Sequence, residues 1–496
     1  MDPIVDTTHG KLRGAREDGL EVFRGIPFAA PPLGPLRFRA PEPAAPWAGV
    51  RDATRFGPSA PQLPVPFDLI PGMDVGATDE DCLFLNVFTP ASASGRRPVL
   101  VWIHGGAFTI GSGSQRMYDA RPLVRKGDVV VVTLNYRLGA LGFLATDGGD
   151  ATPNVGLLDQ VAALRWVREN AAAFGGDPGN VTVFGESAGG MSVGCLLGMP
   201  AARGLFERAV PMSGAAHTVN APEAAARVRA DFCRELGAAD GDLAALRAAP
   251  VEAILAAQQR CEAAYLGHPL RMGFRPCIDG RALPERPIDA IRGGLSKDVD
   301  VLVGATRDEW RLFAMMDPAS RQLDEAGLRK RLEARVPGHE DRILRAYQEA
   351  RPGETPADLF TAIESDRLFR IPAVRLAEAQ SAHREGTFAY LFTWESPLLG
   401  GRLGACHGID VPVVFGLIGT PGAEKFAGGG PEAEALADAA TSAWLGFARS
   451  GRPGHAGLPA WPRFDARRPT MLFGRGCELA LDPYGAERAA WEGVLS

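Results

Sequence analysis

Short runs of aliphatic and β-branched residues recur along the chain, and longer amphipathic stretches separate them. Unbroken apolar runs of strand length are typical of strands buried on both faces of a parallel sheet. The runs that predict such strands are Leu83–Phe88, Pro98–Ile103, Val129–Leu134, Val181–Phe184, Val299–Val303 and Thr387–Phe392. Between them apolar residues recur at helical spacing, most clearly over Gly156–Asn170. This alternation predicts an α/β fold with a central, mostly parallel twisted sheet flanked by helices.

Three other regions of the chain do not show this alternation of strands and helices. Residues 1–90 are rich in proline and glycine, which disfavours long helices, so only short strands are expected there, around Gly10–Arg13 and Glu21–Arg24. Two regions rich in Ala, Arg and Glu, about 221–263 and 318–384, are expected to be helical insertions that form a cap or side wall. Because no repeat or sharp change of composition divides the chain, we expect a single domain over residues 1–496.

Composition and charge exclude several classes of protein. Of 496 residues, 46% are hydrophobic and 23% charged, as in a folded globular protein. The net charge of -6 gives no electrostatic basis for binding nucleic acid. No apolar stretch reaches the roughly 18 residues of a membrane span. The first residues have neither the basic nor the apolar segment of a signal peptide, so a cytoplasmic location is expected.

The seven cysteines have no metal-binding spacing. We therefore expect reduced thiols and no metal site. A single disulfide among Cys233, Cys261 and Cys277 remains an alternative.

The segment that follows the predicted strand Val181–Phe184 carries the clearest chemical signal. It reads Gly185-Glu186-Ser187-Ala188-Gly189, and a Gly-x-Ser-x-Gly pentapeptide between a strand and a helix is typical of a nucleophile elbow. The glycines leave room for a tight turn that exposes the serine hydroxyl, and the helix N-terminus behind it stabilises negative charge. The sequence therefore predicts Ser187 as a nucleophile.

A second glycine motif follows the predicted strand Pro98–Ile103. The glycines of His104-Gly105-Gly106 have no side chains, so their amides can both point at one substrate oxygen, and the amide of Ala188 can add a third donor. An ordinary glycine-rich turn is the alternative. The nearby Gly111 and Gly113 suggest a phosphate-binding loop, but this interpretation is disfavoured because the later glycine and a Lys-Ser/Thr ending are missing.

A base and an acid should follow the nucleophile along the chain, in the order serine, acid, histidine. Among the eight histidines, His407 stands out, because it follows the strand Thr387–Phe392 and a glycine-rich loop. Asp308 and Glu309 both follow the strand Val299–Val303, where a carboxylate would lie beside the other strand ends. Spacing alone does not choose between these two acids.

Several longer motifs, in this order, resemble the type-B carboxylesterase family, the cholinesterase-like branch of the α/β-hydrolase fold, and in particular its bacterial, p-nitrobenzyl-esterase-like members. They are Arg24–Ala29, Glu80–Val87, Asn135–Gly139, Asn154–Gln160, Phe174–Pro178 and Gly185–Gly190. The resemblance spans nearly the whole chain and implies a triad of Ser187, Glu309 and His407. It also implies oxyanion donors at Gly105, Gly106 and Ala188, supporting positions at Glu186 and Ser213, and no metal or organic cofactor.

Departures from the cholinesterases bear on the substrate. The stretch Leu69–Met73 has no aromatic residue where those enzymes carry a tryptophan, which disfavours choline esters. Leu270 and Met272 align with two bulky acyl-pocket aromatics, so longer or bulkier acyl groups should fit. The candidate pocket residues are Phe108, Leu270, Met272, Phe274 and Phe313, and ordinary core packing is the alternative for each.

The expected function is a broad serine carboxylic-ester hydrolase that acts on a small-molecule ester and is a monomer or homodimer. One alternative is the same triad specialised for a carbamate, an amide or a particular xenobiotic or toxin ester. The other is a catalytically silent binding protein of the same fold.

Overall fold

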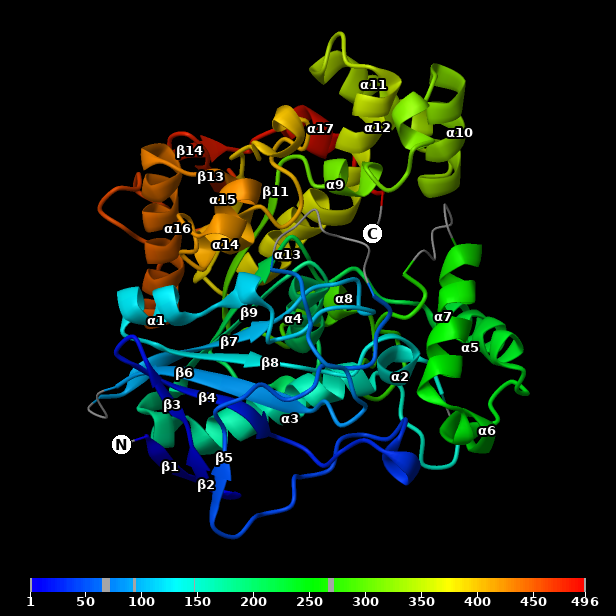
Figure 1. The fold of residues 1–496 in the computed structure, drawn as a ribbon. Helices are drawn as coiled ribbons and strands as arrows, with labels where there is room; N and C mark the ends of the chain where they lie inside the picture. The colour runs from blue at the N-terminus through cyan, green and yellow to red at the C-terminus, as the bar shows by residue number, and fades with distance from the viewer. Residues whose placement is uncertain (1, 65–71, 92–94, 147, 266–271, 495–496) are drawn as a thin grey trace.

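A large sheet runs through the molecule (Figure 1). The structure is a computed structural model that describes residues 2–64, 72–91, 95–146, 148–265 and 272–494. Among the described residues eleven strands form this sheet, in the order β14 (Glu478–Leu481), β13 (Pro469–Phe473), β12 (Thr387–Phe392), β11 (Asp300–Thr306), β10 (Arg208–Met212), β9 (Gly176–Glu186), β7 (Arg97–Ile103), β8 (Val130–Leu134), β6 (Phe84–Pro90), β4 (Leu20–Pro27) and β3 (Ala15–Glu17). A small separate sheet contains β1 (Ile4–Thr7), β2 (Gly10–Arg13) and β5 (Val50–Asp52).

Neighbouring strands from β13 to β8 are parallel, and the strands outside this block pair antiparallel. Every residue of β7 and β8 is buried, as expected for strands covered on both faces. Successive side chains point to opposite faces, so Val101 and Trp102 of β7 enter two different core clusters. The predicted mostly parallel α/β sheet is confirmed, and each apolar run that predicted a strand overlaps one.

Helices cover both faces of the sheet (Figure 1). Apolar side chains of one core cluster come from α3 (Val155–Asn170), α4 (Ala188–Leu197), α8 (Pro287–Arg292) and α13 (Ile371–Ser381). Those of the second cluster come from α1 (Arg121–Gly127), α14 (Asp410–Val414) and α16 (Pro431–Ser450). Shorter helices are α2 (Gly139–Phe143), α9 (Trp310–Ala314), α15 (Pro421–Ala427) and α17 (Gly485–Ala489).

Two groups of helices lie at the periphery of the sheet in Figure 1. The first is α5 (Pro222–Leu236), α6 (Leu243–Ala248) and α7 (Val251–Ala264), and the second is α10 (Glu325–Arg335), α11 (Glu340–Ala350) and α12 (Pro356–Ser365). Helix α13 follows the second group and packs on β11 and β12. The description of the chain as one domain with two helical insertions stays a prediction.

A buried ion pair joins two of the motif segments. The Arg137 guanidinium lies 2.6 Å from the Asp159 carboxylate, and both side chains are almost fully buried. Asp159 also accepts a hydrogen bond from the backbone N–H of Arg137. Because a buried charge is costly unless it is paired and hydrogen-bonded, this pair fixes the loop after β8 against α3.

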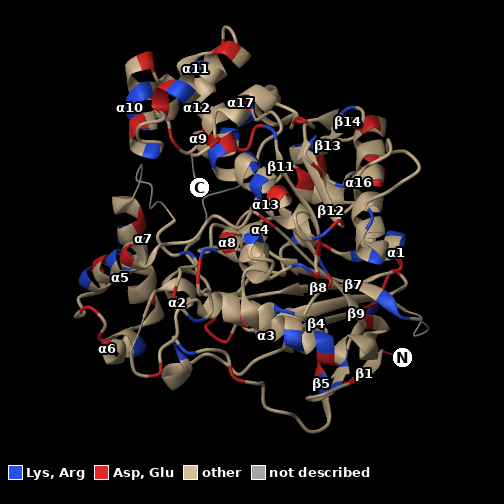
Figure 2. Ribbon diagram, turned by 180° about the vertical axis from the view of Figure 1, so that it is seen from behind, with Lys and Arg blue, Asp and Glu red and all other residues tan. Residues whose placement is uncertain are grey.

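Charged residues of both signs lie side by side on α5 and α10 (Figure 2). Within the described residues, no helix combines the length and the apolar character needed to cross a bilayer. All seven cysteine thiols are free, including Cys233, Cys261 and Cys277.

Candidate active site

The candidate residues follow the carboxyl ends of neighbouring parallel strands. Ser187 comes directly after β9, the two glycines follow β7, Glu309 follows β11, and the loop that carries His407 follows β12. Strands β12, β11, β10, β9 and β7 are consecutive in the sheet. Parallel strands present their carboxyl ends at one edge, so residues distant in sequence meet there.

Ser187 occupies a strained turn between β9 and α4. Its backbone angles are φ 59° and ψ -125°, outside the region that side chains with a Cβ prefer. A methyl group added at Gly185 or Gly189 would lie 2.6 or 2.0 Å from the carbonyl oxygen of Ile103. The two glycines therefore let the turn pass close to β7, which is the steric requirement of a nucleophile elbow.

The loop after β7 runs beside Ser187. A methyl group added at Gly105 would lie 3.0 Å from Ser187 Cβ, so the two backbones are in close contact. Gly106 has φ 114° and its added methyl would lie 2.1 Å from the carbonyl oxygen of Ile110. Among the described residues, the N–H of Gly106 has no hydrogen-bond acceptor, while the N–H of Gly105 faces the hydroxyl of Tyr118. Ala188 is the first residue of α4, where helical N–H groups lack internal partners.

The structure brings Glu309, and not Asp308, to the candidate base. Glu309 Oε2 lies 2.5 Å from His407 Nδ1, and Oε1 accepts a hydrogen bond from the N–H of Thr306. Asp308 instead pairs with Arg307 at 2.7 Å. The fully buried Glu309 carboxylate is thus positioned to orient the imidazole.

The other ring nitrogen of His407 faces a second carboxylate. His407 Nε2 lies 3.1 Å from Glu186 Oε1, and no hydrogen bond joins it to the Ser187 hydroxyl in the structure. Catalytic hydrogen bonds are often long or misaligned when no substrate is bound, so this arrangement does not remove Ser187 from consideration.

The site concentrates titratable groups away from solvent. Burial lowers the pKa of His407, but the carboxylates of Glu186 and Glu309 outweigh it and raise the value to about 9. Burial raises the pKa of Glu186 to about 7, His407 opposes this shift and Glu309 adds to it. Asp410, at the start of α14, has its pKa raised well above its ordinary value by burial and by the same two carboxylates. Within the described residues, no three His, Cys, Asp or Glu side chains form a group suited to a metal ion.

Ser213 lies behind the nucleophile turn. Its φ is 44°, and its N–H donates to the carbonyl oxygen of Gly304 in β11. A methyl group added at the next residue, Gly214, would lie 2.5 Å from the carbonyl oxygen of Ser187. The Ser213 hydroxyl is buried and has no hydrogen-bond partner among the described residues. This segment therefore packs directly against the turn that holds Ser187.

Ser187, Glu186 and His407 open into a cavity of about 790 Å³. Its wall includes Gly105 and Gly106 and is otherwise rich in methionine and aromatic side chains. Met272 and Phe313 line it, as expected of pocket residues. Phe108 packs edge-on against Phe143, and Phe274 packs against Phe232 in the same way, so both belong to the core and not to the cavity wall. Leu270 lies outside the described residues.

Many wall residues were not predicted from the sequence, among them Phe369, His217 and Arg275. Phe369 sits on a π-helical turn, Asp366–Arg370, and its ring centroid lies 4.9 Å from that of His407, as does the ring of Phe313. A π-helical turn inside a helix often marks a functional site, but its sequence does not announce it. His217 and Arg275 are polar and also line the cavity. Their proximity to the site depends on tertiary contacts that periodicity does not encode.

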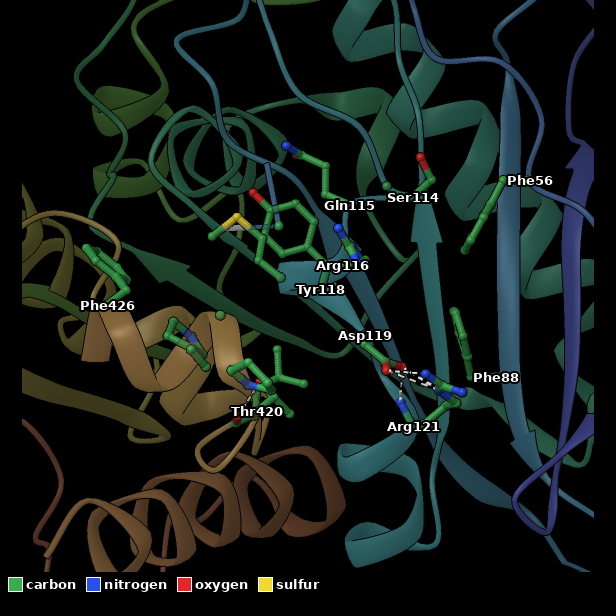
Figure 3. A pocket seen from close by; sticks show the side chains of 18 of the residues that line it. Phe56, Phe88, Ser114, Gln115, Arg116, Tyr118, Asp119, Arg121, Thr420 and Phe426 are labelled. Atoms are coloured by element: carbon green, nitrogen blue, oxygen red, sulfur yellow. Dashed lines mark hydrogen bonds and ion pairs between the residues drawn. The ribbon is translucent and has the colours of Figure 1, made fainter. Parts of the chain in front are cut away.

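A second cavity of about 420 Å³ adjoins the first (Figure 3). Asp119 and Arg121 pair across its wall at 2.7 Å, and Phe56 and Phe88 lie on the same side. Met117, Tyr118 and Phe426 line both cavities, so these three side chains separate the two spaces.

Comparisons with known proteins agree with this geometry. Residues 1–479 match the model of the carboxylesterase family. The para-nitrobenzyl esterase of Bacillus subtilis is 41% identical over 98% of this chain and 97% of its own. A phenmedipham hydrolase of Pseudarthrobacter oxydans is 40% identical over 97% of both chains.

Solved structures show the same relationship. A carboxylesterase of Geobacillus stearothermophilus superposes with a TM-score of 0.88 and 42% identity, over 98% of this chain and 99% of the other. The expected resemblance and fold are thereby confirmed. The chain belongs to the carboxylesterase family and is a carboxylic-ester hydrolase of the α/β-hydrolase fold.

Proposed function

We propose that this chain hydrolyses carboxylic esters with Ser187 as nucleophile, His407 as general base and Glu309 as the acid that orients the imidazole. The observation that carries this assignment is the 2.5 Å contact between Glu309 Oε2 and His407 Nδ1, at the wall of the cavity that also contains Ser187. The bond leaves Nε2 as the nitrogen available to the substrate side.

The reaction has two halves. In the first, the Ser187 oxygen attacks the carbonyl carbon while His407 Nε2 takes the hydroxyl proton, and the same proton then passes to the departing alcohol. This leaves an acyl group on Ser187. In the second half, His407 removes a proton from water, which attacks the acyl carbon, and the carboxylic acid leaves as Ser187 is reprotonated. Ionised Glu309 stabilises the imidazolium in both halves.

The oxyanion formed in each half needs preorganised donors. The N–H groups of Gly105, Gly106 and Ala188 are proposed for this role, because the two glycines line the cavity that contains Ser187 and Ala188 begins the helix directly after it. Glu186 and Ser213 support the site, the first beside His407 Nε2 and the second behind the nucleophile turn.

The cavity favours esters with medium or bulky acyl or alcohol groups. Its volume of about 790 Å³ is that of a site for a drug-sized molecule. Flexible methionines, among them Met191, Met272 and Met316, line it and can adapt to different substrates. The small-molecule ester is the only partner that the proposal requires. We also propose a cytoplasmic location. The proposed oligomeric state is a monomer or a homodimer.

A substrate outside simple esters is the main alternative. A relative bears the name phenmedipham hydrolase, so phenmedipham belongs in the substrate panel, together with carbamates and amides. A preference for one of these over every simple ester would make this chain a specialised member of its family.

The deciding experiment is hydrolysis of p-nitrophenyl esters, from acetate to decanoate, by the wild type and by Ser187→Ala. We expect a burst of p-nitrophenol in the wild type, its loss in the variant, and a chain-length optimum beyond acetate. Equal, negligible rates for both proteins across this panel and the carbamates and amides would contradict the proposal and favour a catalytically silent binding protein.

A further inference from the structure

One cationic side chain of the large cavity is held by a hydrogen bond and, among the described residues, has no acidic partner. Arg275 lines the cavity, three residues after Met272. Its Nε donates a hydrogen bond of 2.7 Å to Asn220 Oδ1, and Asn220 Nδ2 donates to the carbonyl oxygen of Gly273 at 2.8 Å. Backbone hydrogen bonds join Asn220 to Pro276 and Ile278 on either side of Cys277. These hydrogen bonds therefore fix the direction of the Arg275 side chain.

The other guanidinium groups of the same cavity wall each contact a carboxylate. Arg335 and Arg367 both bind the Glu364 carboxylate, at 3.1 and 2.7 Å, and Arg286 pairs with Asp289 at 2.5 Å. Arg275 differs, because among the described residues neither of its Nη atoms hydrogen-bonds or pairs with a carboxylate. An unpaired charge that is largely removed from water is costly, and this cost is relieved when an anion binds.

Arg275 keeps its positive charge in these surroundings. Burial, with a contribution from the Arg367 charge, lowers the pKa of Arg275 to about 10, so the group is still a cation at neutral pH. Glu262 also lines the cavity, but its carboxylate accepts a hydrogen bond from Gln258. His217 lines the cavity as well, and both of its ring nitrogens lack a hydrogen-bond partner among the described residues.

We propose that Arg275 binds a carboxylate carried by the acyl part of the ester, so that this site prefers half-esters of dicarboxylic acids to neutral esters of equal length. The two Nη atoms of a guanidinium match the two oxygens of a carboxylate. Met272, which precedes Arg275 in the same segment, was expected in the acyl pocket and lines the cavity. The inference names the substrate class of the proposed esterase site and therefore rests on that proposed function.

The kinetic test compares mono-p-nitrophenyl esters of succinic, glutaric, adipic and suberic acids with neutral p-nitrophenyl esters of the same chain length. A hydrogen bond to a charged group contributes about 1.5–3 kcal/mol. We therefore expect Arg275→Gln to lower the ratio of kcat/KM for the best half-ester to that for its neutral counterpart by about 10-fold or more, mainly through KM. Arg275→Lys should keep part of this preference. Arg281→Gln, which removes an exposed cation from the same loop, is the matched control.

Binding separates this inference from the proposed function. The Ser187→Ala variant should bind intact monomethyl adipate in calorimetry, and the double variant with Arg275→Gln should bind it at least about 10-fold more weakly. If the wild type hydrolyses neutral esters but Arg275→Gln leaves the ratio and the binding unchanged, the inference is overturned and the proposed function stands. If no ester is hydrolysed, the proposed function fails, and the binding experiment alone decides whether Arg275 holds an anion. If Arg275→Gln lowered kcat/KM equally for the half-esters and the neutral esters, Arg275 would have a structural role only and the inference would be overturned.

Discussion

Glu186 holds a carboxylate oxygen 3.1 Å from Nε2 of His407, the atom that must accept the Ser187 proton in the proposed mechanism. This neighbour stabilises the imidazolium that forms in the transition state. It also stabilises the same imidazolium in the resting enzyme, where a protonated base is inactive. Glu186 therefore couples the strength of the base to the pH at which it can work.

Glu186→Gln should move the acidic limb of the kcat/KM profile to lower pH. The carboxylates of Glu186 and Glu309 raise the pKa of His407 to about 9 against the opposing effect of burial, so the wild-type limb should lie above 6.5, the ordinary value for histidine. Removing one charge destabilises the imidazolium and lowers the pKa, and we expect a shift of about one unit or more. The measurement is hydrolysis of p-nitrophenyl butyrate from pH 5 to 10, with the exposed Glu349→Gln as control. An unchanged limb, or one at higher pH, would contradict the role given to Glu186.

Substitution of the two adjacent acids should separate their roles. Glu309→Gln keeps the shape of the side chain but loses the charge beside His407 Nδ1, so kcat should fall by roughly 10³- to 10⁴-fold, as for other triad acids. Asp308→Asn should leave kcat within about 10-fold and lower the unfolding temperature, because Arg307 loses one of its two acidic partners, Asp308, and keeps Glu395. Steady-state kinetics and thermal unfolding of both variants test this prediction. A larger loss of kcat in Asp308→Asn would reverse the assignment.

Gly106→Ala should abolish most of the activity. The added methyl would lie 2.1 Å from the carbonyl oxygen of Ile110, and φ 114° is strained for alanine, so the N–H of residue 106 must move. Losing one oxyanion donor costs about 10² to 10³ in kcat. Gly148→Ala is the control, since Gly148 has the same φ and open space around the added methyl. If both variants lose activity equally, the effect comes from backbone strain and not from the oxyanion site.

The sequence predicted the site's core because the chemistry there depends on short motifs at strand ends. Ser187 and the glycines follow apolar runs that are typical of buried parallel strands. Because parallel strands present their carboxyl ends at one edge of the sheet, these residues lie close together there. The choice between Asp308 and Glu309 was different. Both follow the same strand, so spacing alone did not separate them and the family resemblance implied Glu309. In the structure Glu309 lies beside His407, whereas Asp308 pairs with Arg307.

The hydrophobic periodicity of the sequence did not predict several other features of the structure. Strand β10 pairs with β9 and β11 although it contains Pro211, a residue that argues against a central strand. Phe108 and Phe313 have the same side chain, yet one packs in the core and the other against His407, because burial in a core and in a cavity wall select the same residue types. Arg275 has no carboxylate partner within the described ranges, and this depends on where the nearby carboxylates lie in space, which the sequence does not specify.

His217 should make the protein sensitive to acid. Burial is the main cause that lowers the pKa of His217, to about 3, and the charges of Arg375, Arg292 and Arg286 add to this against the opposing effect of Asp289. The folded state therefore takes up this proton less readily than the unfolded state, whose histidine has its ordinary pKa near 6.5. Stability is unaffected by this group above pH 6.5 and falls as the pH drops from 6.5 towards 3.

Replacing His217 with glutamine removes this pH-dependent contribution to the free energy of unfolding. Between pH 7.5 and 4.5, the free energy of unfolding of His217→Gln should fall by about 2 kcal/mol less than that of the wild type. Urea unfolding at both pH values measures this difference, and His383→Gln, which removes an exposed histidine, is the matched control. Carboxylates contribute to acid unfolding equally in the two proteins, so only the difference between them reports on His217. A variant that loses as much stability as the wild type would mean that His217 is already charged, or paired, in the folded protein at neutral pH.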